Sequence, residues 1–70
     1  MTIFHYKGIQ IHLRKDQCIR LKYILVYSDE LFQYQQLDSK LNDAIQQKEI
    51  IEMDLREFRW LKENIHLSKI

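Results

Sequence analysis

Apolar side chains recur every three or four residues through the C-terminal half of the chain. This spacing puts them on one face of an α-helix and follows the seven-residue period of coiled coils. From Ser28 to His66 no proline or glycine interrupts the pattern. The residues of this heptad face are Tyr27, Tyr34, Leu37, Leu41, Ala44, Ile51, Leu55, Phe58 and Ile65. The pattern predicts one long amphipathic helix, or two closely packed helices, over residues 28–66.

The start of this helix is predicted at Ser28. The serine hydroxyl can accept from the amides of the first turn, and Asp29 and Glu30 carry negative charge where the helix dipole is positive. An unbroken helix would be about 58 Å long. Because this exceeds the span of a small sheet, the helix must pair with another chain or fold back. The candidate breaks are residues 37–39 and 42–43, where Asp, Ser and Asn could cap a second helix.

Alternating apolar and polar residues predict a β-hairpin at the N-terminus. Residues 2–6 and 9–13 are rich in β-branched and aromatic side chains and flank Lys7-Gly8, which contains the only glycine. A two-residue turn places the apolar side chains on one face. The pairs that it predicts are Tyr6–Ile9, Phe4–Ile11 and Thr2–Leu13. Because lysine rarely adopts a positive φ, a longer bulged loop with a register shifted by one residue remains an alternative.

Residues 18–27 are apolar on almost every side and fit two structures. As a third strand they extend the apolar face of the hairpin. As a helix capped by Asp16 they continue into the helix that follows. The density of Ile, Val and Tyr favours the strand, and so does the helix-start signal, which comes only at Ser28.

The predicted fold is therefore α+β, in a single domain of residues 1–70. An antiparallel hairpin or three-stranded meander over residues 1–27 precedes a long amphipathic C-terminal helix over residues 28–66. The alternative is a mainly α fold, in which a helical hairpin broken near residues 37–39 follows a short β-hairpin.

Two apolar faces of the predicted helix are candidates for protein contacts. A chain of 70 residues buries little surface alone, so we expect oligomerisation. The predicted oligomer interface comprises Leu37, Leu41, Ile51, Leu55, Phe58 and Ile65. A second stripe, off the heptad face, comprises Phe32, Ile50, Met53 and Trp60. This stripe either packs on the chain's own sheet or on a folded-back helix, or it forms a partner-binding face anchored by the tryptophan, a residue type that often dominates interface energies.

Charge is divided unevenly along the chain. The net charge of the whole chain is +1, but the residues before Ser28 carry +4 and the remainder carries −3. If residues 18–27 form a strand, the polar face of the sheet is cationic. The candidate anion-binding residues on it are His5, His12, Arg14, Arg20 and Lys22. Such a face could bind a phosphate, a nucleotide or a nucleic-acid backbone, and the alternative is a solvated surface that supplies solubility.

The motifs expected of an enzyme or a metal site are not found in the sequence. The single Cys18 excludes an internal disulfide and is typical of a reducing cytoplasm. Its spacing from His5 and His12 matches no zinc pattern. Activation of its thiolate by His12 or Arg20 would need a pocket that a fold this small rarely provides. We therefore predict a cytoplasmic, non-enzymatic protein without a metal or other cofactor.

Three functions are compatible with these features. The first is a protein-interaction module that homo-oligomerises through its C-terminal helix and binds a partner protein. The second is an anion, nucleotide or nucleic-acid binder that uses the basic N-terminal face. The third, by analogy of size and composition, is a small phage or mobile-element inhibitor that blocks or sequesters a host component.

Overall fold

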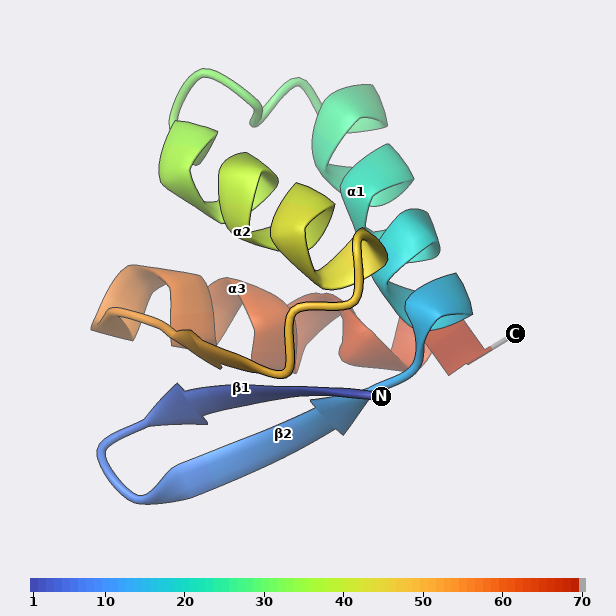
Figure 1. Ribbon diagram of the computed structural model, residues 1–70. Helices are drawn as coiled ribbons and strands as arrows, with labels where there is room; N and C mark the ends of the chain where they lie inside the picture. The colour runs from blue at the N-terminus through green and yellow to red at the C-terminus, as the bar shows by residue number, and fades with distance from the viewer. Residues whose placement is uncertain (70) are drawn as a thin grey trace.

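Two strands, two helices, a third strand and a third helix follow one another along the chain, which a computed structural model describes over residues 1–69 (Figure 1). The elements are β1 (Thr2–Tyr6), β2 (Ile9–Leu13), α1 (Lys15–Tyr27), α2 (Gln35–Ile45), β3 (Ile50–Glu52), α3 (Leu55–Asn64) and the 3₁₀ turn η1 (Ile65–Lys69). The α+β class is confirmed. The single long C-terminal helix is wrong, because two shorter helices and a strand occupy that region.

The N-terminal hairpin forms in the predicted register. β1 and β2 are antiparallel, with the pairs Thr2–Leu13, Phe4–Ile11 and Tyr6–Ile9. Lys7 and Gly8 have φ angles of 44° and 83°. These values fit a type I′ turn, which needs positive φ at both central residues. Lys7 therefore adopts the positive φ that is unusual for lysine, and the bulged loop with a shifted register is not formed.

The third strand comes from the second half of the chain and is parallel to β1. The strand order is β2-β1-β3, with Ile3 beside Ile50 and His5 beside Glu52. The backbone N–H of Ile3 donates to the carbonyl of Glu49 at 2.8 Å, and that of Met53 donates to the carbonyl of His5 at 2.9 Å. The heptad pattern had assigned this segment to a helix.

Residues 18–27 belong to helix α1, so the preferred prediction of a strand is wrong there. Cys18, Leu21 and Leu25 are fully buried, at the three- and four-residue spacing of one helix face. The side chain of Gln17 accepts a hydrogen bond from the backbone N–H of Arg14 at 3.0 Å and satisfies one amide at the helix start.

Helix α1 ends where the sequence predicted that a helix begins. The N–H of Asp29 donates to the carbonyl of Val26, and that of Glu30 donates to the carbonyl of Leu25. Asp29 has a φ of 60°. These two bonds and the left-handed residue form a Schellman motif, which normally contains glycine at this position. Ser28 and Asp29 therefore close α1 and start no helix.

Helix α2 ends in the same motif. Gln47 has a φ of 73°, its N–H donates to the carbonyl of Ala44, and the N–H of Lys48 donates to the carbonyl of Asp43. The predicted breaks at residues 37–39 and 42–43 are wrong, because both lie inside α2. The alternative helical hairpin broken near residue 38 is wrong for the same reason.

Replacing Gln47 with glycine should raise the free energy of unfolding by about 0.5–1 kcal/mol. Glycine adopts positive φ without the steric cost that a Cβ imposes, a gain partly offset by its larger entropy when unfolded. Urea denaturation followed by circular dichroism measures the change. The control is Gln46→Gly, at the C-cap with a φ of −85°, which should not stabilise. Equal effects of the two substitutions would contradict the assigned motif.

Helix α3 begins with a reciprocal pair of side-chain hydrogen bonds. A carboxylate oxygen of Asp54 accepts from the backbone N–H of Glu57, and a carboxylate oxygen of Glu57 accepts from the backbone N–H of Asp54, each at 2.9 Å. This capping box satisfies two free amides of the first turn. It also places the side chain of Glu57 in the protein interior, where it is 4% exposed.

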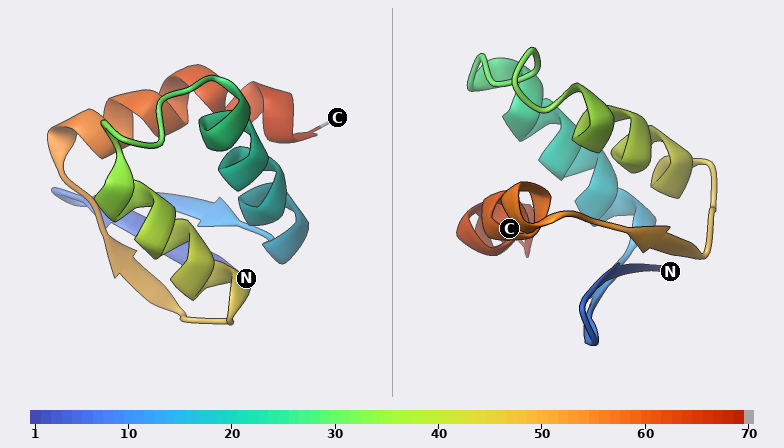
Figure 2. Two further views of the ribbon diagram at one scale, coloured as in Figure 1. Left: turned by 90° about the horizontal axis from the view of Figure 1, so that it is seen from above. Right: turned by 90° about the vertical axis from the view of Figure 1, so that its left-hand side faces the viewer.

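All three helices lie on one side of the sheet, and α1 and α2 pack side by side (Figures 1 and 2). The core lies between the two layers and takes residues from every helix and strand. Its buried apolar residues are Phe4, Leu13, Cys18, Leu21, Leu25, Leu37, Leu41, Ala44, Ile51, Met53, Trp60 and Leu61. Half of the predicted oligomer interface is therefore inside the folded chain.

Candidate protein-contact surface

Large apolar side chains are exposed at one end of the α1–α2 helix pair, on the last turns of α1 and on the loop that follows. We call the exposed set Tyr23, Val26, Tyr27, Leu31 and Phe32 the hairpin-end surface. Tyr23 is 55% exposed, Tyr27 82% and Phe32 84%. With about 200 Å² for each aromatic side chain, these three alone expose roughly 400 Å². The loop that carries Leu31 and Phe32 is at the top of Figure 1.

The local structure explains this exposure. Tyr23 and Tyr27 are four residues apart in α1, on the side away from the core, and their rings stack with centroids 6.1 Å apart. The Schellman motif then turns the chain away from the helix axis. As a result, Leu31 and Phe32 belong to an exposed loop and not to a helix face that packs on a neighbour.

The predicted oligomer interface is divided between core and surface. Leu37, Leu41 and Ile51 are buried inside the single chain, so they are not available to a second copy in this fold. The correction follows from the break after α2, which folds the heptad face back onto the sheet. Leu55 is exposed, and Phe58 and Ile65 are half-buried against the core.

The second predicted stripe is also divided. Met53 and Trp60 belong to the core, and Trp60 is only 2% exposed, so the prediction of a surface anchor at Trp60 is wrong. The alternative interpretation, that these residues pack inside the chain's own fold, agrees with the burial of both side chains. Phe32 and Ile50 are exposed but lie on different elements, one in the hairpin-end surface and the other on β3.

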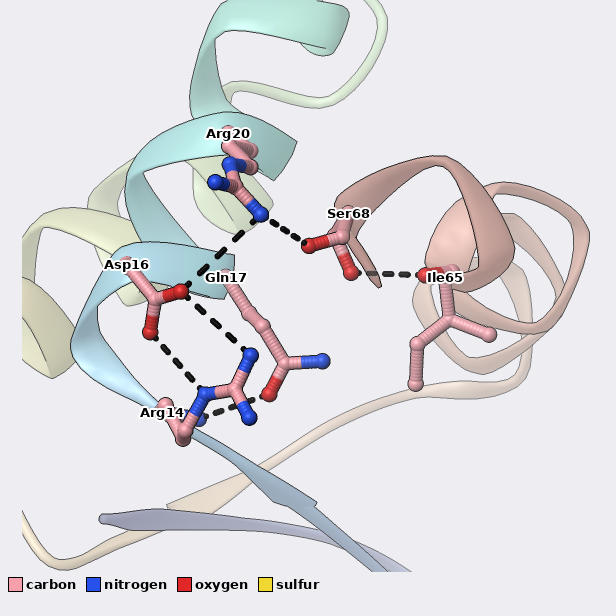
Figure 3. A network of polar contacts seen from close by, with 6 residues as sticks. All are labelled: Arg14, Asp16, Gln17, Arg20, Ile65 and Ser68. Carbon is pink, nitrogen blue, oxygen red and sulfur yellow. Dashed lines mark hydrogen bonds and ion pairs between the residues drawn. The ribbon is translucent and has the colours of Figure 1, made fainter. Parts of the chain in front are cut away.

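The basic residues do not form the predicted cationic sheet face, because residues 18–27 are helical. Arg14 and Arg20 lie near the start of α1 and share Asp16 (Figure 3). The hydrogen bond from Arg14 to Asp16 holds the pKa of that carboxyl below its usual value. Arg20 also donates to the backbone carbonyl of Ser68 at 3.0 Å, which ties α1 to the C-terminal turn.

The other three predicted anion-binding residues lie elsewhere. The ammonium of Lys22 donates to the side chain of Asn42 and lies 3.7 Å from a carboxylate oxygen of Asp38. His5 contacts Glu52 at 2.9 Å, and His12 is the one other member of the predicted set on the same face of the sheet. The structure thus brings the predicted anion-binding residues together only as the pairs Arg14–Arg20 and His5–His12. A carboxylate lies beside each pair and also beside Lys22.

Cys18 is inside the core. Burial raises the pKa of its thiol to about 11, and the nearby Asp16 acts in the same direction. The thiol is therefore protonated at neutral pH and lacks the thiolate that a nucleophile or metal ligand needs.

Within residues 1–69, no group of three or more His, Cys, Asp or Glu side chains is arranged to hold a metal ion. The helices of that same range include none with the length and apolar character needed to cross a bilayer.

Sequence reasoning found Phe32 but missed the other members of the hairpin-end surface. Tyr23 and Tyr27 were assigned to a sheet face or to the heptad pattern, where both would be covered. The available signal was their four-residue spacing in a segment that also fits a helix. Comparison of the chain with protein-family models, curated proteins and solved structures finds no match. Any function must therefore be inferred from the chain's own residues.

Proposed function

We propose that this protein is a non-enzymatic protein-interaction module that self-associates and binds a partner protein through the hairpin-end surface. The observation that supports it is the roughly 400 Å² of exposed aromatic surface carried by Tyr23, Tyr27 and Phe32. Exposed apolar surface of a few hundred Å² on a small protein commonly marks a contact site.

The size of the patch indicates a weak interface. A standard protein interface buries about 800 Å² on each partner, about a sixth of this chain's accessible surface of 4759 Å². The three aromatic residues supply about half of that area. Because association carries a large entropic cost, we expect a micromolar or weaker dimer when only this surface is buried.

Self-association needs a surface that is complementary to itself. In a dimer with twofold symmetry the same patch of each copy meets its counterpart. The stacked tyrosines on α1 supply an apolar surface that can meet its own copy across such an axis. This surface replaces the C-terminal helix as the proposed contact.

Sedimentation equilibrium tests the proposal from micromolar to millimolar concentrations. We expect the wild-type chain to associate and the double variant Tyr27→Ser/Phe32→Ser to remain monomeric. The matched control is Ile50→Ser, which removes an exposed apolar side chain from β3, on the sheet, and should behave as the wild type. A wild-type monomer throughout, or equal association of the double variant, would overturn the proposed self-association.

A photo-crosslinking residue at position 27 tests binding of a different protein. The control carries the same residue at Gln10, an exposed position of β2. We expect position 27 to form specific crosslinks that position 10 does not. Crosslinks of equal yield at both positions would argue against a defined contact surface. An inhibitor that sequesters a host component is one form of this function and shares the test.

A further inference from the structure

The lysines and arginines of this protein fall into two groups. Those within 4.0 Å of a carboxylate are Arg14, Arg20, Lys22, Lys40 and Lys48. Among the side chains that the structure describes, those without a carboxylate at this distance are Lys7, Lys15, Arg56, Arg59 and Lys62. Except for Lys15, the second group lies on α3 or on the turn between β1 and β2. This part of the surface therefore carries positive charge that the ion pairs of residues 1–69 do not neutralise.

An aromatic stack joins the hairpin turn to α3. The rings of Tyr6 and Phe58 lie with their centroids 5.0 Å apart. The ammonium of Lys7 lies 5.6 Å from the ring centroid of Tyr6, and that of Lys62 lies 5.5 Å from the ring centroid of Phe58. Because the two rings are in contact, the cation of the turn belongs to the same surface as the cations of α3.

The cations of α3 follow one another along its exposed side. Arg56, Arg59 and Lys62 are three residues apart, a spacing that makes each one the neighbour of the next on a helix surface. The guanidinium of Arg56 lies over the ring of Tyr34, with its central carbon 5.1 Å from the ring centroid. We call Lys7, Arg56, Arg59 and Lys62 the cationic row.

The carboxylates of two exposed residues lie near the cationic row. That of Asp54 accepts from the backbone N–H of Glu57 and caps the first turn of α3. Glu63 directly follows Lys62 in the same helix. Four cations and two carboxylates give this surface a formal charge of +2. The row therefore favours an anionic partner.

Exposed aliphatic side chains beside the row indicate which class of anion fits. Leu55, one helical turn before Arg59, is 43% exposed, and Ile9, the strand partner of Tyr6, is 47% exposed. A phosphate backbone has no apolar group to cover them. Tyr6 and Phe58 are half-buried and stack on each other, so they are poor platforms for nucleobases. An acidic protein segment supplies both carboxylates and apolar side chains.

We propose that the cationic row binds an acidic segment of the partner protein that contacts the hairpin-end surface. A cavity of about 330 Å³, lined in part by Phe32, Asp54 and Arg56, connects the two surfaces. A partner seated on Phe32 therefore reaches Arg56 first and the rest of the row along α3. The inference rests on the proposed protein-binding function, and it specifies the partner's chemistry as carboxylates interspersed with aliphatic side chains.

The test is a titration of the isotope-labelled protein with the peptide acetyl-EELEELEE-amide, followed by backbone amide NMR shifts. We expect saturable shifts on α3 and the hairpin turn, and binding at least fivefold weaker in about 0.5 M sodium chloride, which screens exposed charges. The peptide acetyl-QQLQQLQQ-amide has the same length and leucines without the charge, and it should bind at least tenfold more weakly. Absence of saturable shifts, or equal binding of the two peptides, would overturn the inference.

An oligothymidylate with as many phosphates as the acidic peptide has carboxylates tests the other class of anion. At equal charge, we expect it to bind at least threefold more weakly than the peptide, because it leaves Leu55 and Ile9 uncovered. Binding as tight as that of the peptide would assign the row to a nucleic-acid backbone and rule out the acidic segment.

Paired substitutions separate a defined site from a general effect of charge. Arg59→Gln/Lys62→Gln removes two exposed cations of the row, keeps good helix formers, and should weaken peptide binding at least tenfold. The matched control, Lys15→Gln/Lys48→Gln, changes the net charge equally at exposed positions outside the row, and its affinity should stay within twofold of the wild type. Equal weakening by the two double variants would contradict a site on α3.

Lys7→Asn tests the contribution of the hairpin turn. Asparagine tolerates the positive φ of this position, which is 44°, so the variant removes the cation and keeps the turn. Peptide binding should weaken at least threefold. Unchanged binding would confine the site to α3 and reject the four-residue row.

The titration is repeated with Tyr27→Ser/Phe32→Ser, which removes two aromatic side chains of the hairpin-end surface and leaves the cationic row intact. Its affinity for the acidic peptide should fall by less than threefold, whereas loss of binding would place the peptide on the hairpin-end surface and overturn the inference. A failed titration with crosslinks at position 27 retained rejects only the acidic segment. Peptide binding without such crosslinks rejects the proposed function instead, so the two failures are distinguishable.

Discussion

Replacing Trp60 with alanine should cost about 3–5 kcal/mol of folding free energy, the usual range for truncating a large buried aromatic side chain. Trp60 is 2% exposed, and its ring centroid lies 6.2 Å from that of Tyr34. A chain of this size has a stability of about 3–10 kcal/mol. The variant should therefore be largely unfolded or retain only a small part of the wild-type stability in urea denaturation followed by circular dichroism.

The control for this prediction is Phe32→Ala. Phe32 is the other aromatic residue of the second predicted stripe, and it is 84% exposed. Its free energy of unfolding should stay within about 0.5 kcal/mol of the wild type. Near-wild-type stability of Trp60→Ala would contradict the buried position and restore Trp60 as a candidate surface anchor.

Replacing Lys40 with methionine should destabilise the protein by about 3 kcal/mol. The Lys40 side chain is 27% exposed and that of Glu57 only 4%, so the substitution leaves a buried carboxylate without its cation. Removing one partner of a buried ion pair costs more than the pair contributes, because the remaining charge is not solvated. Thermal and urea unfolding measure the loss.

A second substitution tests this explanation. The double variant Lys40→Met/Glu57→Gln replaces the pair with neutral side chains and keeps the capping acceptor, so it should recover most of the lost stability. Lys48→Met serves as the control, because Lys48 and Asp43 form an exposed pair at 4.0 Å and should contribute less than about 1 kcal/mol. If Lys40→Met and Lys48→Met lower the free energy of unfolding equally, then Glu57 is not a buried charge that needs Lys40 for its stabilisation.

The strand pairing of the N-terminal hairpin could be predicted from the sequence. The residues of the candidate contact surface could be predicted only in part. Phe32 was identified as a contact residue, but Trp60 and Met53 were grouped with it because an unbroken helix would place all of them on one stripe. A helical pattern places residues on one face only as long as the helix is unbroken between them. Once α2 ends, the positions after it no longer share a face with those before it.

The sequence by itself determined the hairpin, since Lys7-Gly8 and the alternation of its flanking strands act over a few residues. It also determined that apolar side chains are abundant enough to form a core. Tertiary structure alone decided that residues 18–27 are helical, that Asp29 and Gln47 adopt positive φ without being glycine, and that residues 50–52 form a strand. The physical reason is that each of these choices is unfavourable or neutral locally. The helix over residues 18–27 and the strand over residues 50–52 become stable through contacts distant in sequence, such as Ile50 beside Ile3 and the packing of α1 on α2. The two positive φ angles accompany the local hydrogen bonds that close α1 and α2 where the chain turns.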